Sequence, residues 1–354
     1  MLLLGAAVVA VLAWKTVNSA AVIPGKATEV RDLTVPQGAS LRAVLRELQQ
    51  QQLIGDARYL EWYLRFREPG KAAVAPGIKA GHYRIAPGQQ PLTILRQLVE
   101  GRIVLEHITI VEGWTFAQMR GALLRKTGLA TVTRNLSDTQ IMAELGAPDL
   151  PAEGRFAPDT YAFAPGTTTD MQILRLAFDA QQRTLRKAWD SRQPDLPFAS
   201  AAEALALASI VEKETGLASE RARVAGVYIN RLRKGMRLQS DPTVIYGIGP
   251  RYDGNIRKRD LLADNPYNTY TRTGLPPTPI ALPGHDAIVA TLNPEKTDAL
   301  FFVAIGDGSG GHYFSATFAE HNRALQRYLG RLRGDLPTGA PTVARPAESA
   351  TGTR

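Results

Sequence analysis

The stretch AAEALALASIVEKETG, residues 201–216, is the part of the chain from which the fold is best predicted. Its apolar residues recur at helical spacing, so Leu207 and Val211 fall on one face of an α-helix. At about 100° per residue, Glu214 lies about 20° from Leu207 and therefore inside this apolar face. We expect the helix to end at Gly216, because glycine commonly closes helices. The stretch therefore predicts a buried helix with a carboxyl group on its last turn.

The environment of Glu214 suggests a chemical role. A carboxyl group on an apolar face is partly desolvated, which raises its pKa and keeps it protonated near neutral pH. A protonated carboxyl is the general acid that cleavage of a glycosidic bond requires. The alternative is a core-edge acid paired with an arginine such as Arg221 or Arg231. The pattern by itself leaves both interpretations open.

Composition and charge exclude several classes of protein. The chain has 354 residues, 44% hydrophobic and 21% charged, as in a globular protein of two or three domains. Its net charge of +9 suits nucleic acid, anionic lipid or an acidic polymer. Because the arginines are scattered, we expect no nucleic-acid partner. The chain lacks cysteine and its five histidines lack metal-ligand spacing, so we expect neither a metal centre nor a cofactor.

The N-terminal run MLLLGAAVVAVLAW, residues 1–14, is apolar and uncharged. As a helix it would span about 21 Å, against the ~30 Å of a bilayer core. Continuation to residue 23 supplies the length but admits Lys15 and Asn18. We expect a transmembrane anchor over residues 1–23, with its true start upstream of Met1. A degenerate signal peptide and a buried first helix are the alternatives.

A strand–turn–helix pattern occurs three times in the N-terminal third. The β-prone runs cover residues 33–38, 83–88 and 108–113, and each ends on a glycine. In the helices that follow, apolar residues stand six and ten positions after the glycine: Val44, Leu48, Ile94, Leu98, Met119 and Leu123. The pattern predicts either a β-turn-α module repeated for packing or a LysM-like glycan-binding module.

The remaining sequence predicts mostly helices. We expect helices over residues 57–67, 170–194 and 316–333, and two helices over 201–235 separated near Gly216. Residues 236–285 are rich in Gly, Pro, Asn and Tyr and indicate ordered loop. LFFVA, residues 300–304, indicates a buried strand, and the composition of 335–354 indicates a disordered tail.

Several long motifs carry a family resemblance. ASIVEKETG is followed by VAGVYINRLRKGMRLQSDPTVIYG, then by YNTYTRTGLPPTPIALPG (267–284) and GGHYFSATFAEHN (310–322). Upstream stands EGRFAPDTYAF (153–163). These motifs span nearly the whole chain and strongly resemble the endolytic murein transglycosylases (the MltG or YceG-like family). Thr278 and Asn293 depart from the family pattern, where Gly and His are common.

The resemblance implies an α+β fold with a defined organisation. It implies a transmembrane anchor (1–23), a linker (24–30), a LysM-like β-α region (31–125), a mixed α/β catalytic domain of YceG-like type (126–334) and a disordered tail (335–354). It also implies a single-pass protein of the bacterial inner membrane whose catalytic domain faces the periplasm. Peptidoglycan glycan strands, the membrane and cell-wall synthesis complexes are the implied partners.

The resemblance further implies a reaction. Glu214 matches the family's catalytic residue, which protonates the oxygen between MurNAc and GlcNAc. It then acts as a base while the C6 hydroxyl of the sugar attacks C1, leaving a 1,6-anhydro-MurNAc end. The expected function is that of an endolytic peptidoglycan lytic transglycosylase, a carbon–oxygen lyase that terminates elongation of nascent strands.

Other residues are candidates for substrate contact. Tyr267, Asn268 and Tyr270 offer two amphipathic rings and an amide for sugar faces and N-acetyl groups. Asp241 and Thr243 in SDPT, and Asp159 in PDTY, contact substrate or order their loops. Glu212, Asp159 and Asp241 are candidate supporting carboxylates.

Two competing functions remain open. A glycan-binding scaffold without activity would use the repeats over residues 33–124. A true hydrolase would need a second carboxylate to activate water.

Overall fold

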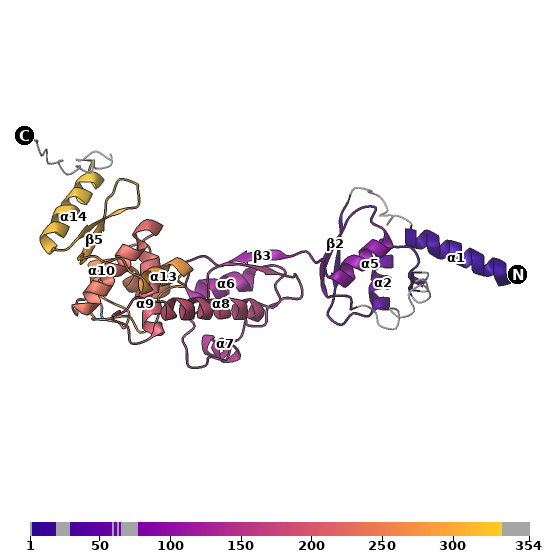
Figure 1. Ribbon diagram of the computed structural model, residues 1–354, viewed down its shortest axis with the longest axis horizontal. Helices are drawn as coiled ribbons and strands as arrows, with labels where there is room; N and C mark the ends of the chain where they lie inside the picture. The colour runs from indigo at the N-terminus through magenta and orange to yellow at the C-terminus, as the bar shows by residue number, and fades with distance from the viewer. Residues whose placement is uncertain (1, 19–28, 59, 62–63, 65–76, 335–354) are drawn as a thin grey trace, which may run out of the picture. The chain divides into compact units, whose positions relative to one another are not determined.

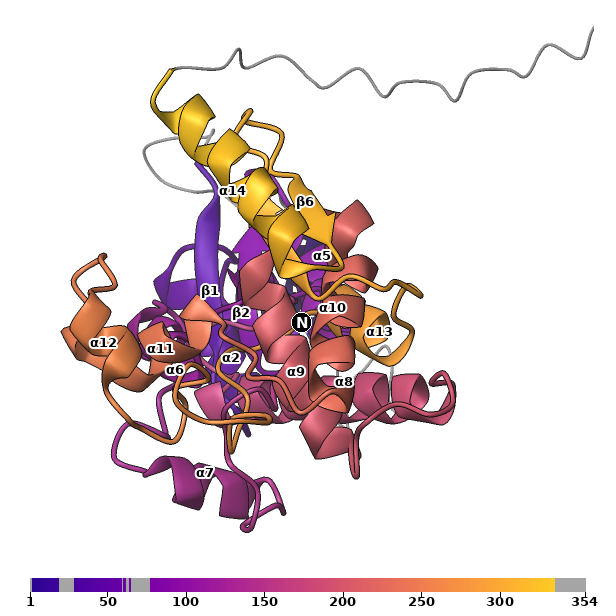
Figure 2. The ribbon, with the colours of Figure 1, turned by 90° about the vertical axis from the view of Figure 1, so that its left-hand side faces the viewer.

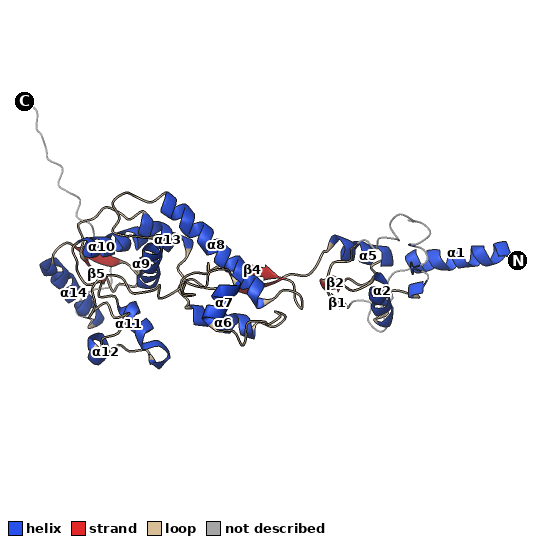
Figure 3. Ribbon diagram, turned by 90° about the horizontal axis from the view of Figure 1, so that it is seen from below, coloured by secondary structure: helices blue, strands red, loops and turns tan. Residues whose placement is uncertain are grey.

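The computed structural model describes residues 2–18, 29–58, 60–61, 64 and 77–334. Within these residues, helices predominate and the strands form three two-stranded antiparallel sheets (Figure 3). This mixture of helices and small sheets confirms the predicted α+β class. The chain divides into a first unit, Met1–Ile110 with Ala117–Asp149 and Asp159–Ala177, and a second unit, Val111–Phe116 with Leu150–Pro158 and Phe178–Arg354.

The first helix, α1, covers Leu2–Asn18 (Figure 1). Several of its apolar side chains are exposed, including Val8 at 53% and Trp14 at 60%. In the described part of the chain, no helix combines the length and the apolar character needed to cross a membrane.

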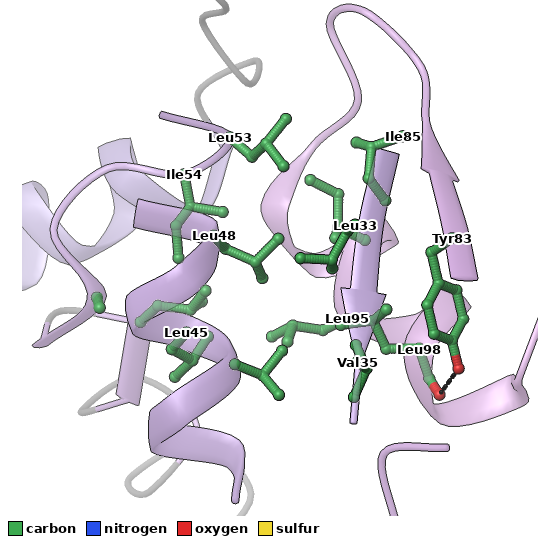
Figure 4. Packing of buried hydrophobic residues seen from close by; sticks show 14 residues of the cluster. Leu33, Val35, Leu45, Leu48, Leu53, Ile54, Tyr83, Ile85, Leu95 and Leu98 are labelled. Atoms are coloured by element: carbon green, nitrogen blue, oxygen red, sulfur yellow. Dashed lines mark hydrogen bonds between the residues drawn. The ribbon is translucent and has the colours of Figure 1, made fainter. Parts of the chain in front are cut away.

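Two strand–turn–helix copies share one core in the first unit. β1 (Arg31–Val35) pairs antiparallel with β2 (Gly81–Ile85), and α2 (Leu41–Gln50) and α5 (Pro91–Glu100) follow the two strands. Leucine, isoleucine and valine side chains of all four elements pack together (Figure 4). Tyr83 is fully buried there, and its hydroxyl donates to the backbone carbonyls of Lys79 at 2.5 Å and Leu98 at 3.3 Å.

The local geometry of the repeat agrees with its prediction. Gly38, Gly88 and Gly113 have φ angles of 76°, 72° and 75°, which glycine adopts without steric cost. The six apolar positions predicted to face the core are all buried: Val44, Leu48, Ile94, Leu98, Met119 and Leu123. The third copy, however, pairs differently from the first two.

The third strand, β3 (Glu106–Thr109), pairs antiparallel with β4 (Thr160–Phe163). Residues on either side of position 125 therefore form one sheet, although the sequence suggested a domain boundary there. α6 (Phe116–Arg125), α7 (Asp138–Glu144) and α8 (Asp170–Asp190) complete this part of the chain. The buried Asp170 carboxylate accepts hydrogen bonds from Val132 N and from the hydroxyl of Thr133.

The second unit is organised around α9 (Ala201–Glu214). α10 (Arg221–Arg233), preceded by the 3-10 turn η1 (Ala218–Glu220), and α13 (His285–Leu292) pack against α9 (Figure 2). All residues from Ala204 to Val211 are buried, so α9 is covered on every side and not only on the predicted stripe. The helix ends because Thr215 is extended (φ −138°, ψ 129°), and not through a glycine cap at Gly216 as predicted.

The segment predicted as ordered loop contains regular structure. α11 (Asp241–Ile248), η2 (Gly249–Arg251) and α12 (Lys258–Leu262) form within it. Pro242 lies in the first turn of α11, where its missing N–H costs no hydrogen bond. Sequence composition misses this helix because Pro, Gly and Asp also mark turns.

The C-terminal part of the second unit is a hairpin followed by a helix. β5 (Phe301–Ala304) pairs with β6 (His312–Ser315), and α14 (Phe318–Leu332) packs on both strands. All four residues of β5 are half-buried, so the prediction of a buried strand is wrong. Most of the predicted helix over 57–67 and all of the tail over 335–354 lie outside the described residues.

Candidate active site

The carboxyl group of Glu214 stands at the last residue of α9. Its Oε1 accepts two short hydrogen bonds, from the hydroxyls of Tyr228 and Ser240, each at 2.6 Å. Tyr228 belongs to α10, whereas Ser240 immediately precedes α11. Three separate elements of the second unit therefore converge on one carboxylate oxygen.

The arginine pairing considered as an alternative is not what the structure contains. Arg221 lies 3.5 Å from Asp286, and Arg231 donates to the backbone carbonyls of Leu238 at 2.7 Å and Leu300 at 2.6 Å. The hydrogen-bond partners of Glu214 in the described chain are hydroxyl groups. A hydroxyl donor, unlike a guanidinium, does not hold the carboxyl in its charged form with a full positive charge.

The two hydroxyl donors determine where the proton of a neutral Glu214 resides. An oxygen that accepts two hydrogen bonds acts as the carbonyl oxygen of the acid. The proton therefore belongs on Oε2, which has no hydrogen-bond partner among the described residues. The side chain is only partly exposed, so the acidic proton is held at the edge of an apolar core.

Burial raises the pKa of Glu214 above that of an ordinary glutamate. The hydrogen bonds from Ser240 and Tyr228 act in the opposite direction, because they stabilise the charged form. The negative charge of Asp241 raises the pKa further, whereas His312 lowers it. Burial also raises the pKa of Tyr228 well above its usual value, so this residue donates and does not ionise.

An unusual backbone conformation supports Ser240. The preceding residue, Gln239, has a φ of 50°, a left-handed conformation uncommon for residues other than glycine. The amide of Gln239 donates to the carbonyl of Thr269 at 3.1 Å, and the amide of Ser240 donates to the Thr269 hydroxyl at 3.0 Å. These bonds hold the strained residue in place and aim the Ser240 hydroxyl at Glu214.

Two of the predicted substrate-contact residues lie near Glu214. Asp241 is exposed on the first turn of α11, and the Tyr270 hydroxyl donates to its Oδ1 at 2.5 Å. The charge of Asp241 raises the pKa of Glu214, and burial, Asp241 and Glu214 together raise the pKa of Tyr270. Tyr267 is half-buried: its ring packs edge-on against Tyr246 at 4.8 Å.

Thr278 gives Tyr267 a hydroxyl partner. Its Oγ1 lies 3.0 Å from the Tyr267 hydroxyl oxygen. The sequence predicts that Thr278 departs from the family pattern, and its hydroxyl makes a contact that a glycine has no side chain to make.

Asn268 and Thr243 serve the architecture of the loops. Both side chains are fully buried. The Asn268 amide donates to three backbone carbonyls at the end of α12, of Asp260, Leu261 and Ala263. The Thr243 hydroxyl donates to the Ser240 carbonyl at 2.6 Å. This geometry favours loop architecture over substrate contact for both residues.

The other two candidate carboxylates, Glu212 and Asp159, each accept a hydrogen bond from a backbone amide. Glu212 Oε2 accepts from Gly284 N at 2.9 Å, and burial together with the neighbouring Glu112 raises the pKa of Glu212. Asp159 lies in the first unit, where its Oδ1 accepts from Thr160 N at 2.6 Å. Asp159 and Glu214 therefore belong to different units of the chain.

Sequence reasoning missed three polar residues of this region. Tyr228 and Ser240 bind Glu214, but a tyrosine inside a helix and a serine before a turn carry no signal of that contact. Glu153 accepts from Phe116 N at 2.9 Å and from the Tyr246 hydroxyl at 3.1 Å. Only its place in the motif EGRFAPDTYAF could have indicated it.

Comparison with known proteins identifies the family. Residues 33–327 match the YceG-like family. The chain belongs to the YceG-like family. It is 31% identical over 315 residues to a Bacillus subtilis protein named endolytic murein transglycosylase, a match covering 84% of each chain. A Streptococcus pneumoniae protein of the same name is 27% identical, and the match covers 83% of this chain and 58% of that protein.

A solved structure supports the YceG-like fold. The crystal structure of a yceG-like protein from Listeria monocytogenes aligns with a TM-score of 0.53 at 29% identity. The alignment covers 84% of this chain and 99% of the Listeria chain. The YceG-like match extends over both units of the chain.

The raised pKa of Glu214 predicts that Glu214→Gln stabilises the folded protein at neutral and alkaline pH. Below the ordinary glutamate pKa, the folded and unfolded chains both carry a neutral carboxyl. As the pH rises through the folded pKa, the wild type must ionise a buried group and loses stability, whereas glutamine stays neutral. Denaturant unfolding should show a gain on the order of 1 kcal/mol at pH 8 and a smaller difference at pH 4.

Glu144→Gln is the control, because the Glu144 side chain is exposed and its charge is therefore not desolvated. Equal effects of both substitutions at pH 8 would show that burial of Glu214 does not penalise its charge.

Proposed function

We propose that this chain is an endolytic peptidoglycan lytic transglycosylase that cuts MurNAc–GlcNAc bonds within nascent glycan strands. The observation that carries the proposal is the carboxyl of Glu214, half-buried, bound on Oε1 by two hydroxyls and free of protein partners on Oε2 among the described residues. The names of the related proteins agree with this reaction.

In the first step, Glu214 acts as a general acid. Its Oε2 proton passes to the glycosidic oxygen as the bond from that oxygen to C1 of MurNAc breaks. The GlcNAc side leaves with a free hydroxyl, and Glu214 is left as a carboxylate. The Tyr228 and Ser240 hydroxyls stabilise that carboxylate through Oε1, so they aid proton transfer.

In the second step, the same carboxylate acts as a base. It takes the proton of the C6 hydroxyl of MurNAc while that oxygen bonds to C1. The product is a 1,6-anhydro-MurNAc end, and Glu214 regains its proton, so no water is consumed. One carboxyl group is sufficient because the sugar supplies the nucleophile.

Substrate contact falls to the exposed groups near Glu214. Tyr270 and Asp241 are joined by a hydrogen bond and present a ring and a carboxylate that a sugar can bind. The Tyr270 ring provides an apolar surface for a sugar face. Asp241 is also the carboxylate that a hydrolase would use to activate water, so it separates the two mechanisms.

We further propose that the protein works at the bacterial inner membrane, with its catalytic part in the periplasm. The uncharged run over residues 1–14 and the exposed apolar side chains of α1 support an anchor, because such side chains favour an apolar surrounding. There the enzyme meets strands as they emerge and terminates their elongation beside the cell-wall synthesis complexes. In this proposal, the LysM-like repeats either pack the first unit or bind the glycan.

Glu214→Gln should lower cleavage of isolated sacculi by at least about 10³-fold, because the glutamine amide is far too weak an acid to protonate the glycosidic oxygen. The fold should persist, since its side-chain carbonyl still accepts from Tyr228 and Ser240. Soluble muropeptide release and the melting temperature are the measurements.

Asp241→Asn, Glu212→Gln and Asp159→Asn should each reduce activity less than Glu214→Gln does. Full activity of Glu214→Gln would remove Glu214 from the reaction, and no cleavage by the wild type would favour a binding scaffold.

Digestion in ¹⁸O-labelled water should leave the new MurNAc ends unlabelled. The lyase step uses the sugar's own hydroxyl, so the ends are also lighter by one water than hydrolytic ends. Mass spectrometry of the products measures both properties, and a known muramidase provides the labelled control. Incorporation of ¹⁸O at the new reducing ends would make the enzyme a hydrolase.

The full-length protein should sediment with membranes and resist carbonate extraction, because the N-terminal run is apolar and contains no charged residue over positions 1–14. A chain that begins at residue 29 should be released to the soluble fraction and serves as the matched control. Recovery of the full-length protein in the soluble fraction would contradict the anchor.

A further inference from the structure

A carboxylate–imidazole pair lies outside the hydrogen bonds made by Glu214. Glu220, the last residue of η1, reaches β6, where its Oε2 lies 2.7 Å from His312 Nδ1. Its Oε1 accepts from the backbone amide of His312 at 3.0 Å. Both carboxylate oxygens therefore bind the same residue, and the side chains are 19% and 13% exposed.

The imidazole ring is fixed by aromatic side chains as well. The His312 ring meets Phe302 edge-on, with centroids 5.5 Å apart, and lies 6.3 Å from Phe314. Phe302 in turn meets the ring of Tyr228 edge-on at 5.8 Å. Because Tyr228 donates to Glu214, packed rings connect the imidazole to the catalytic carboxyl.

The fixed ring has one nitrogen available. Nδ1 is bound by Glu220, whereas Nε2 has no hydrogen-bond partner among the described residues. The ring lies within electrostatic range of Glu214, and a positive charge on it lowers the pKa of that carboxyl.

We propose that Glu220 and His312 are positioning residues for the reaction assigned above to Glu214. Glu220 holds the imidazole in place through both of its carboxylate oxygens, and a positive charge on that ring stabilises the Glu214 carboxylate formed when the glycosidic oxygen takes its proton. His312 opposes Asp241, whose charge disfavours that carboxylate. The other titratable groups that face Glu214 are Tyr228, Arg231 and Tyr270.

Two substitutions test the pair: one removes the His312 ring, and the other removes only the charge of Glu220. His312→Asn retains a side-chain N–H for Glu220 but removes the ring and, with it, any positive charge. Glu220→Gln retains an acceptor for the His312 amide and a donor for Nδ1 but removes the carboxylate charge. The matched control is His285→Asn, because His285 is an exposed histidine bonded to Asp286 at 3.0 Å in the same unit.

The decisive measurement is the titration of Glu214 by carboxyl ¹³C NMR, with its resonance assigned by its loss in Glu214→Gln. In His312→Asn the pKa of Glu214 should rise, and in Glu220→Gln it should rise by less. His285→Asn should titrate as wild type. The kcat on sacculi should fall about tenfold in His312→Asn, because a carboxyl with a higher pKa gives up its proton less readily, and KM should change less than twofold. The pH at which activity is lost should move upward.

Three results would overturn the proposal. Unchanged titration of Glu214 in folded His312→Asn would show that the pair does not act on the carboxyl. A raised KM with unchanged kcat would make His312 a substrate contact instead. If His312→Asn does not fold, unchanged titration in Glu220→Gln decides against the pair. The NMR titration needs no substrate, so it remains informative even if Glu214→Gln retains activity and the proposed lyase function fails.

Discussion

The arrangement of the second unit depends on placing one ionisable carboxyl at the edge of an apolar core. Glu214 follows eight consecutive buried residues of α9, and a charge there is costly unless it is hydrogen-bonded. Tyr228 and Ser240 supply those bonds. Because the donors come from α10 and from the turn before α11, the carboxyl sets how closely three elements approach. A small shift of any of them would leave Oε1 with one donor fewer and change the acidity of the group.

The surrounding contacts keep those elements in place. Ser209, also on α9, accepts from Ile280 N at 2.9 Å, and Glu212 accepts from Gly284 N, so the 280–284 segment is fastened to the same helix. On the other side of α10, Asn230 donates to the carbonyls of Thr297 and Ala299, just ahead of β5. The hairpin that carries His312 is thereby held against the helix that carries Tyr228. The side chains of Ser209, Glu212 and Asn230 thus support the site through hydrogen bonds to backbone groups of neighbouring segments.

The first unit contains strand–turn–helix copies, two of which pack their helices and strands into one core. A two-stranded sheet is marginally stable by itself, so it needs the core that it shares with the two helices. Gly38 and Gly88 adopt the positive φ of the turns that bring each helix back onto its strand. The burial of every predicted apolar position shows that each copy uses its helix face for packing.

Local patterns in the sequence were enough to predict several of the helices, the repeated turns and the place of the Glu214 carboxyl on an apolar helix face. Helical spacing places Glu214 beside Leu207 whatever surrounds the helix, and a glycine at the end of each repeat indicates a left-handed turn by itself. The motifs were also sufficient to assign the family. Short-range pattern was not sufficient for α11, whose Pro and Asp equally signal a turn, nor for the end of α9 at Thr215.

Only the tertiary structure determined which groups meet Glu214. Tyr228 is 14 residues away along the chain, Ser240 is 26 away, and the Glu220–His312 bond spans 92 residues. It also showed that Asn268, attractive as a sugar-binding amide, is enclosed by its own loop, and that Asp159 belongs to the other unit. Hydrogen bonds and burial depend on distances between elements, and those distances follow from how the helices pack. Periodicity within one segment contains no information about them.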